Sequence, residues 1–105
     1  MGFDIENDGS TEEPIHDFVP VTTSRKRLLE GSPAKVTRGV VIRAPRANTA
    51  TIFVGGRRVT SDQARGTAGM PIDPGESITI PCRDASKLYV ITASGAEQGA
   101  HWLGI

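Results

Sequence analysis

The sequence contains a single cysteine, Cys82, in 105 residues. One cysteine excludes an internal disulfide framework and any metal site built from several cysteines. The chain also lacks an unbroken apolar run of about 18 residues, so we expect no membrane-spanning helix. Its first residues are acidic and have neither the basic flank nor the apolar stretch of a secretory signal peptide, so we expect no such signal there.

Patterns typical of catalysis or metal binding are also missing. The two histidines, His16 and His101, lie far apart, and no third group stands at a spacing that would orient either of them as a base. The glycine-rich stretches 55–58 and 66–69 lack the Gly-Lys-Ser or Gly-Lys-Thr ending of a phosphate-binding loop, which favours turns. We therefore expect no enzyme activity, no metal and no cofactor.

Aromatic residues are few, with three Phe, one Tyr and one Trp, and the net charge is zero. Proteins that bind single-stranded nucleic acid use stacked aromatic side chains and a clear excess of basic charge. We therefore expect no nucleic-acid partner. The basic runs 25–27 and 57–58 are better explained as solvent-facing groups or as contacts to an acidic protein surface, and Arg57 and Arg58 are candidate partner-binding residues.

The net charge of zero conceals an uneven distribution. Residues 1–17 contain six carboxylates and no Lys or Arg, whereas residues 18–105 contain all twelve basic residues and the other six acidic ones. This asymmetry favours an acidic interaction arm attached to a mildly basic domain. The alternative is that the acidic segment is only disordered and solvated.

We place the end of the predicted arm at Pro14, so that residues 1–14 form a flexible acidic arm and residues 15–105 form one domain. The arm contains too few apolar groups to order itself alone. Its only large apolar side chains are Phe3 and Ile5. With Ile15 and Phe18 just beyond the arm, they are candidate apolar pegs for a partner's groove or sheet edge.

From Ile15 onward, short β-branched and apolar runs alternate with turn residues. The runs recur about every ten residues without an amphipathic helical pattern, which is typical of an antiparallel β-sandwich or small barrel. We predict an all-β domain of seven to eight short strands, jelly-roll-like or barrel-like, with an edge or bulge at Pro20 and a type II turn at Pro74–Gly75. The expected strands are 15–23, 39–44, 49–55, 57–60, 70–75, 76–82, 87–92 and 100–105, while 24–29 is open between a strand and a short helical turn.

The strands predicted at 39–44 and 49–55 are interpreted as a pair. Alternation places the core at Val40, Ile42, Ala50, Ile52 and Val54, and Asn48 is interpreted as capping the turn between them. Outward positions of the later strands include Phe53, Tyr89 and Ile91, so these strands are apolar on both faces. Such a sheet needs a second covering layer, and another protein is a candidate for that layer.

Residues 36–105 carry a resemblance to a known family. Its motifs are the strands Arg-Gly-Val-Val-Ile-Arg-Ala (38–44) and Asn-Thr-Ala-Thr-Ile-Phe-Val-Gly-Gly (48–56), the Pro-Gly-Glu turn within 69–81, and the closing strands 86–93 and 101–105. Their order resembles the small β-sandwich virion proteins of tailed bacteriophages, which are capsid decoration (cement) proteins or modules of head fibres and tail parts. The resemblance implies a structural protein on the capsid exterior, often a trimer, that binds the major capsid protein or other virion proteins.

Two alternatives stay open. The chain could belong instead to the head–tail junction, the tail or a fibre of the virion, where six- or twelve-fold rings are expected. In a different class, it could be a carbohydrate-binding β-module. That function predicts an exposed aromatic side chain, Trp102 or Tyr89, beside polar groups in a pocket.

Overall fold

The computed structural model describes residues 15–30, 33–62 and 68–105. The predicted arm, including Phe3 and Ile5, lies outside these residues. Within them no helix has the length and apolar character needed to span a membrane. The only helical element in the described ranges is a 3₁₀ turn, Ala85–Lys87. The strands are β1 (His16–Val21), β2 (Lys26–Arg27), β3 (Gly39–Arg43), β4 (Ile52–Gly55), β5 (Met70–Ile72), β6 (Ser77–Pro81), β7 (Tyr89–Thr92) and β8 (Gln98–Gly104).

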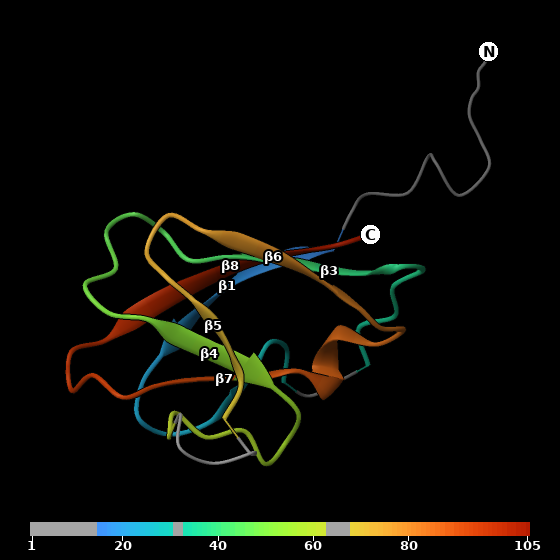
Figure 1. The fold of residues 1–105 in the computed structure, drawn as a ribbon. Coiled ribbons are helices and arrows are strands. Elements are labelled where there is room, and N and C mark those ends of the chain that lie inside the picture. The colour runs from blue at the N-terminus through green and yellow to red at the C-terminus, as the bar shows by residue number, and fades with distance from the viewer. Residues whose placement is uncertain (1–14, 31–32, 63–67) are drawn as a thin grey trace.

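The eight strands form two four-stranded antiparallel sheets with the orders β1-β8-β3-β6 and β2-β7-β4-β5. Figure 1 shows them as two layers, with β1, β3, β6 and β8 in one and β4 and β7 in the other. The pairs β1·β8, β2·β7, β3·β6 and β4·β5 are those of one long hairpin. The hairpin is rolled up, so β8 also pairs with β3 and β7 with β4. This arrangement is a jelly roll, and it confirms the predicted all-β sandwich.

The interpretation of residues 39–44 and 49–55 as a strand pair is wrong. Strand β3 belongs to one sheet and β4 to the other, so the two face each other across the core. The intervening segment crosses between the layers. At its start Ala44 N donates to Glu76 O at 2.9 Å, beside β6 of the first sheet, and at its end Ile52 pairs with Ile72 of β5 in the second sheet. The predicted type II turn is confirmed, since Glu76 N donates to Asp73 O and Gly75 has a φ of 87°.

The core lies between the two sheets and is built mainly from Val, Ile and Leu. Four of the predicted core residues, Val40, Ile42, Ile52 and Val54, are buried in it. Ala50 is only half-buried and precedes β4. Trp102 supplies the one aromatic ring of this main cluster and is 2% exposed. Its indole Nε1 donates to Leu28 O at 3.1 Å, which satisfies the buried donor.

Polar side chains of one corner join the 48–51 segment to β8. Gln98 is buried, and its Oε1 accepts hydrogen bonds from Thr49 N at 2.7 Å and Ala50 N at 3.0 Å. Asn48 exchanges hydrogen bonds with the backbone of Gly99, accepting at 2.8 Å and donating at 2.9 Å. Asn48 therefore joins two elements, whereas the sequence had suggested a local turn cap. These bonds replace a strand ladder along residues 48–51.

The second apolar layer is supplied by the chain itself. Phe53, Ile91 and Val59 form a separate buried cluster with Tyr89 packed against it. Val59 reaches this position because a tight turn, closed by Val59 N donating to Gly56 O, folds residues 56–59 back over β4 and β7. The suggestion that another protein covers Phe53 and Ile91 is therefore corrected. The predicted strand at 57–60 is this covering turn.

The sheet edges are poor templates for further strand pairing. Edge strands β1, β5 and β6 contain Pro20, Pro71 and Pro81, respectively. The fourth edge, β2, is two residues long and consists of Lys26 and Arg27, which settles the ambiguous segment 24–29 as a short strand. Proline removes a backbone donor, and short charged edges discourage pairing. The expected edge position of Pro20 is confirmed.

Candidate interaction surfaces

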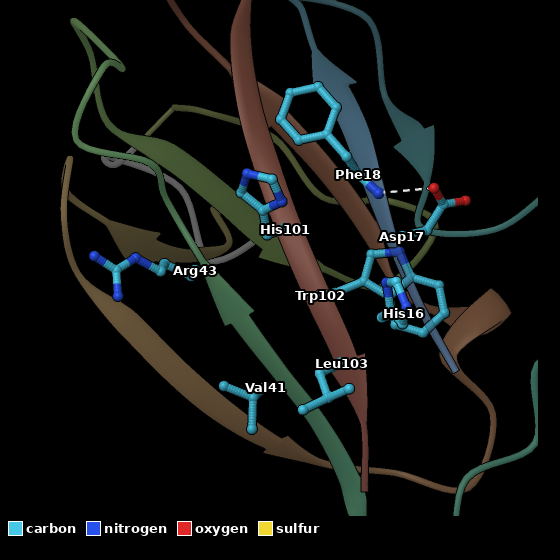
Figure 2. A pocket seen from close by; sticks show the side chains of 8 residues that line it. All are labelled: His16, Asp17, Phe18, Val41, Arg43, His101, Trp102 and Leu103. Carbon is cyan, nitrogen blue, oxygen red and sulfur yellow. Dashed lines mark hydrogen bonds between the residues drawn. The ribbon is translucent and has the colours of Figure 1, made fainter. Parts of the chain in front are cut away.

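The outer side of sheet β1-β8-β3-β6 carries six side chains in two rows across its first three strands. Register places Phe18 opposite His101 and His101 opposite Arg43 in one row. The other row joins His16, Leu103 and Val41 in the same way. Because side chains alternate along a strand, the neighbours Val19, Ala100, Trp102 and Ile42 point into the core. We call these six outward residues the apolar face, and Figure 2 shows them together.

The largest apolar groups of this face are accessible to solvent. Phe18 is 48% exposed and Leu103 39%. The rings of Phe18 and His101 lie 4.7 Å apart at a tilt of 54°, an edge-to-face type of contact. Ile15 and Ile105 are also exposed, at the end of the sheet where Gly104 N donates to Ile15 O. The structure thus places two predicted pegs, Ile15 and Phe18, on the surface, and their binding role stays a prediction.

A shallow hollow of about 550 Å³ overlies the apolar face. Asp17 borders it, but its carboxylate already accepts a hydrogen bond from Phe18 N at 2.8 Å. Among the described residues, no three His, Cys, Asp or Glu side chains are grouped as metal ligands would be. The chemistry that this surface offers is therefore contact with an apolar patch, bordered by two imidazoles and one guanidinium.

The other sheet carries a cluster of positive charges around Tyr89. Arg27 lies opposite Tyr89 in the β2·β7 ladder, and its Nε donates to the Tyr89 hydroxyl at 2.7 Å. Arg25 Nη1 donates to Arg57 O at 2.8 Å. Arg27, Arg57, Lys87 and Tyr89 line a hollow of about 200 Å³ with Ser86. We call Arg25, Arg27, Arg57 and Lys87, together with Tyr89, the arginine cluster.

The arginine cluster has a net positive charge. In the described part of the chain no ion pair joins its cations to a carboxylate; the hydrogen bonds of Arg25 and Arg27 go to a carbonyl and a hydroxyl. The bond to Tyr89 is the main cause that raises the pKa of the Arg27 guanidinium, with smaller contributions from Glu30 and Asp84. Arg27 therefore stays charged at neutral pH.

The sequence identified only part of this cluster. Of the two predicted binding arginines, Arg57 belongs to it, whereas Arg58 lines a different hollow beside Val59 and Gly69. Arg25 and Arg27 belong to the basic run 25–27, for which the sequence left solvent or an acidic protein surface open, and Lys87 was not singled out. Their basic character was visible, but Arg27 and Tyr89 are 62 positions apart, and only the pairing of β2 with β7 brings them together.

Asp84 has a structural role beside the arginine cluster. Its Oδ1 accepts hydrogen bonds from the Ser86 hydroxyl at 2.7 Å, Ser86 N at 2.9 Å and Ala34 N at 3.0 Å. These bonds, with that of the Ser86 hydroxyl first, lower the pKa of Asp84 below its ordinary value of 3.8. The carboxylate thereby ties the segment around Ala34 to the 3₁₀ turn.

The aromatic side chains give little support to the carbohydrate-binding alternative. Trp102 is buried, with its indole N–H bound inside the core. Tyr89 is half-buried, and the Arg27 guanidinium carbon lies 5.6 Å from the centre of its ring. Neither ring stands free as a stacking platform for a sugar.

The two surfaces are the basis on which a function can be proposed for this chain. Comparison with models of protein families, with curated proteins and with solved structures finds no match.

Proposed function

We propose that this chain is a structural protein of a tailed-phage virion, a capsid decoration protein that binds the major capsid protein lattice. The observation that carries the proposal is the apolar face, with Phe18 exposed on the edge strand β1 and Leu103 exposed on the neighbouring strand β8 of one sheet. Exposed apolar side chains that share one surface are typical of protein interfaces. The virion setting is suggested by the family resemblance of residues 36–105.

Docking through a face is favoured over docking through a sheet edge. Three edge strands contain proline and the fourth has only two residues, which disfavours strand addition. The mixture of groups on the face also fits a protein surface, because Phe18, Leu103 and Val41 offer apolar contact while His16, His101 and Arg43 can contact acidic or polar side chains.

The size of the apolar face implies a second contact. Three strands spaced about 4.8 Å apart, with five residues of about 3.3 Å each, give a footprint of roughly 240 Å². A standard protein interface buries about 800 Å² on each partner. In this proposal the acidic arm supplies the remainder, with Phe3 and Ile5 as apolar pegs on a neighbouring subunit. Repetition of both contacts over the lattice would then stabilise the shell.

The jelly-roll architecture agrees with a capsid function, but it does not distinguish that function from sugar binding. Jelly rolls recur in viral capsids and also in lectins, and a fold alone does not determine function. The burial of Trp102 and the contact of Tyr89 with Arg27, the two rings that a sugar site was expected to use, favour the structural function over sugar binding.

The direct test is to locate the chain in assembled particles by electron cryomicroscopy. We expect its density on the outer surface of the capsid, with the β1-β8-β3-β6 sheet against the major capsid protein. Density in a ring at the neck or in the tail would replace decoration by the junction alternative. Particles without this chain would contradict a virion function altogether.

A further inference from the structure

We propose that the arginine cluster is a binding site for an extended acidic peptide, and that in the free protein this peptide is residues 4–13 of the same chain. The inference concerns the isolated chain and does not depend on the virion function. It rests on the geometry of the cluster, on its charge and on the position at which the acidic segment joins the domain.

The cluster presents hydrogen-bond donors that are held in place. Arg27 is fixed by its bond to the Tyr89 hydroxyl, and Arg25 by its bond to Arg57 O. A guanidinium has several N–H donors in a fixed plane, matched to the geometry of carboxylates. Each of these two groups uses one donor in those bonds, so most of their donors have no partner among the described residues. Lys87 and Arg57 add charge at the same hollow.

The charge of the cluster complements that of the acidic segment. Glu30 and Asp84 are the carboxylates that act electrostatically on Arg27, and Asp84 is committed to Ala34 and Ser86. Asp84 also interacts electrostatically with Lys87, so these two carboxylates offset only part of the charge of the four cations, and an excess of positive charge is left. Residues 4–13 contain no Lys or Arg, and their carboxylates are Asp4, Glu6, Asp8, Glu12 and Glu13.

The acidic segment joins the domain at the end of the sandwich where the cluster lies. Ile15 is held there by Gly104 N, and Asp17, two residues on, pairs with Trp102. Trp102 in turn bonds across the core to Leu28, the residue next to Arg27. Packed sheets are about 10 Å apart, whereas fourteen extended residues reach roughly 45 Å. The segment is therefore long enough to reach the cluster of its own chain.

Tethering favours the segment of the same chain over a free competitor. A short flexible linker gives its ligand an effective concentration in the millimolar range, which lets individually weak ion pairs add up. A nucleic acid would need stacking rings, and the one ring here, Tyr89, already lies against Arg27. An acidic segment from a second copy has the same chemistry, and the experiment separates it from the intramolecular contact.

The test places a nitroxide label in the acidic segment and observes the domain by NMR. The lone Cys82 is replaced (C82S), the label is attached at S10C, and the protein is labelled with ¹⁵N. We expect loss of signal for the backbone amides of Arg27, Arg57 and Lys87. The loss should disappear in R25Q/R57Q. It should also disappear in about 1 M NaCl, where the Debye length is about 3 Å and attraction between exposed charges is screened. The control R43Q/R46Q, which removes two arginines elsewhere, should retain it.

Three outcomes would overturn the inference. Unchanged signals at the cluster in the labelled protein, or signal loss that persists in R25Q/R57Q, would remove the cluster as the binding site. A mixture separates contacts within one chain from contacts between two chains. It contains nitroxide-labelled protein without ¹⁵N and ¹⁵N-labelled protein without nitroxide, and we expect no signal loss in it. Loss in that mixture would show that the segment binds a second copy.

Discussion

The ring of Phe18 lies over the backbone of Gly99 on the neighbouring strand. A Cβ atom at Gly99 would stand 2.6 Å from both Cε1 and Cζ of that ring. The glycine therefore gives Phe18 the room to lie across β8 and reach the ring of His101. The geometry of the apolar face depends on this missing side chain.

Replacing Gly99 with alanine should displace the Phe18 ring while preserving the fold. The clash involves the far end of a side chain that can rotate, so we expect the free energy of unfolding to change by only about 1 kcal/mol. The nuclear Overhauser contacts between Phe18 and His101 should be lost, and capsid binding should weaken. G95A is the matched control, because nothing lies within 4 Å of a Cβ there. Retained ring contacts in G99A would contradict this account.

The double variant F18S/L103S tests the apolar face as the docking surface. Burial of each side chain in an interface is worth about 1.5–3 kcal/mol, so we expect binding to undecorated capsids to fall at least about tenfold. The stability of the free protein should barely change, because both residues are exposed. The control M70S removes an apolar side chain that is 60% exposed on the other sheet. Equal binding by the two variants would exclude this face.

Gln98 should be one of the most sensitive polar positions. In Q98A the N–H groups of Thr49 and Ala50 lose their acceptor. Leaving partly buried donors unpaired costs about 1–3 kcal/mol each, so we expect a loss of about 3 kcal/mol in urea unfolding. The neighbouring exposed Glu97 serves as control, and E97A should change stability by less than about 0.5 kcal/mol. A wild-type midpoint for Q98A would show that water replaces the side chain.

A substitution at Val59 tests whether residues 56–59 cover Phe53 and Ile91 in solution. V59A removes buried methyl groups that pack on Phe53 and Ile91, and we expect a loss of about 2 kcal/mol. The same change at half-buried Val41 should cost less than about 1 kcal/mol. If the two substitutions cost the same, residues 56–59 do not form a tight cover in solution.

Asp84 should contribute a pH-dependent part of the stability. Its pKa in the folded chain is lower than the ordinary 3.8, so the unfolded chain binds the proton more tightly. Its contribution is complete above the ordinary value and is lost as the pH falls through the lower, folded pKa. We expect D84N, which keeps an acceptor but loses the charge, to flatten this acid-side decline. Urea unfolding across the acid range measures it, and parallel curves for the two proteins would contradict it.

The positions of most strands in the chain were predictable from the sequence, whereas the pairing of the strands within the two sheets was not. Alternation along β6 is visible in the chain and correct in the structure, with Ile78 and Ile80 turned inward. The separation of β3 from β4 was missed because a short Pro-containing break suits a hairpin as well as a crossing between sheets. Alternation of Gln98, Ala100 and Trp102 could have indicated that Gln98 faces inward. The arginine cluster, by contrast, exists only through long-range pairing.

The rolled hairpin also determines at which stage of synthesis and folding the apolar face can form. The pair β4·β5 closes over a short stretch of chain, whereas β1·β8 joins the first and last described strands. Closing so long a loop is entropically costly, and contacts distant in sequence form slowly. During synthesis the chain must emerge from the ribosome through Gly104 before β8 can fill the gap between β1 and β3. A nascent chain that ends before β8 therefore lacks the apolar face, because His101 and Leu103 of β8 form its central strand.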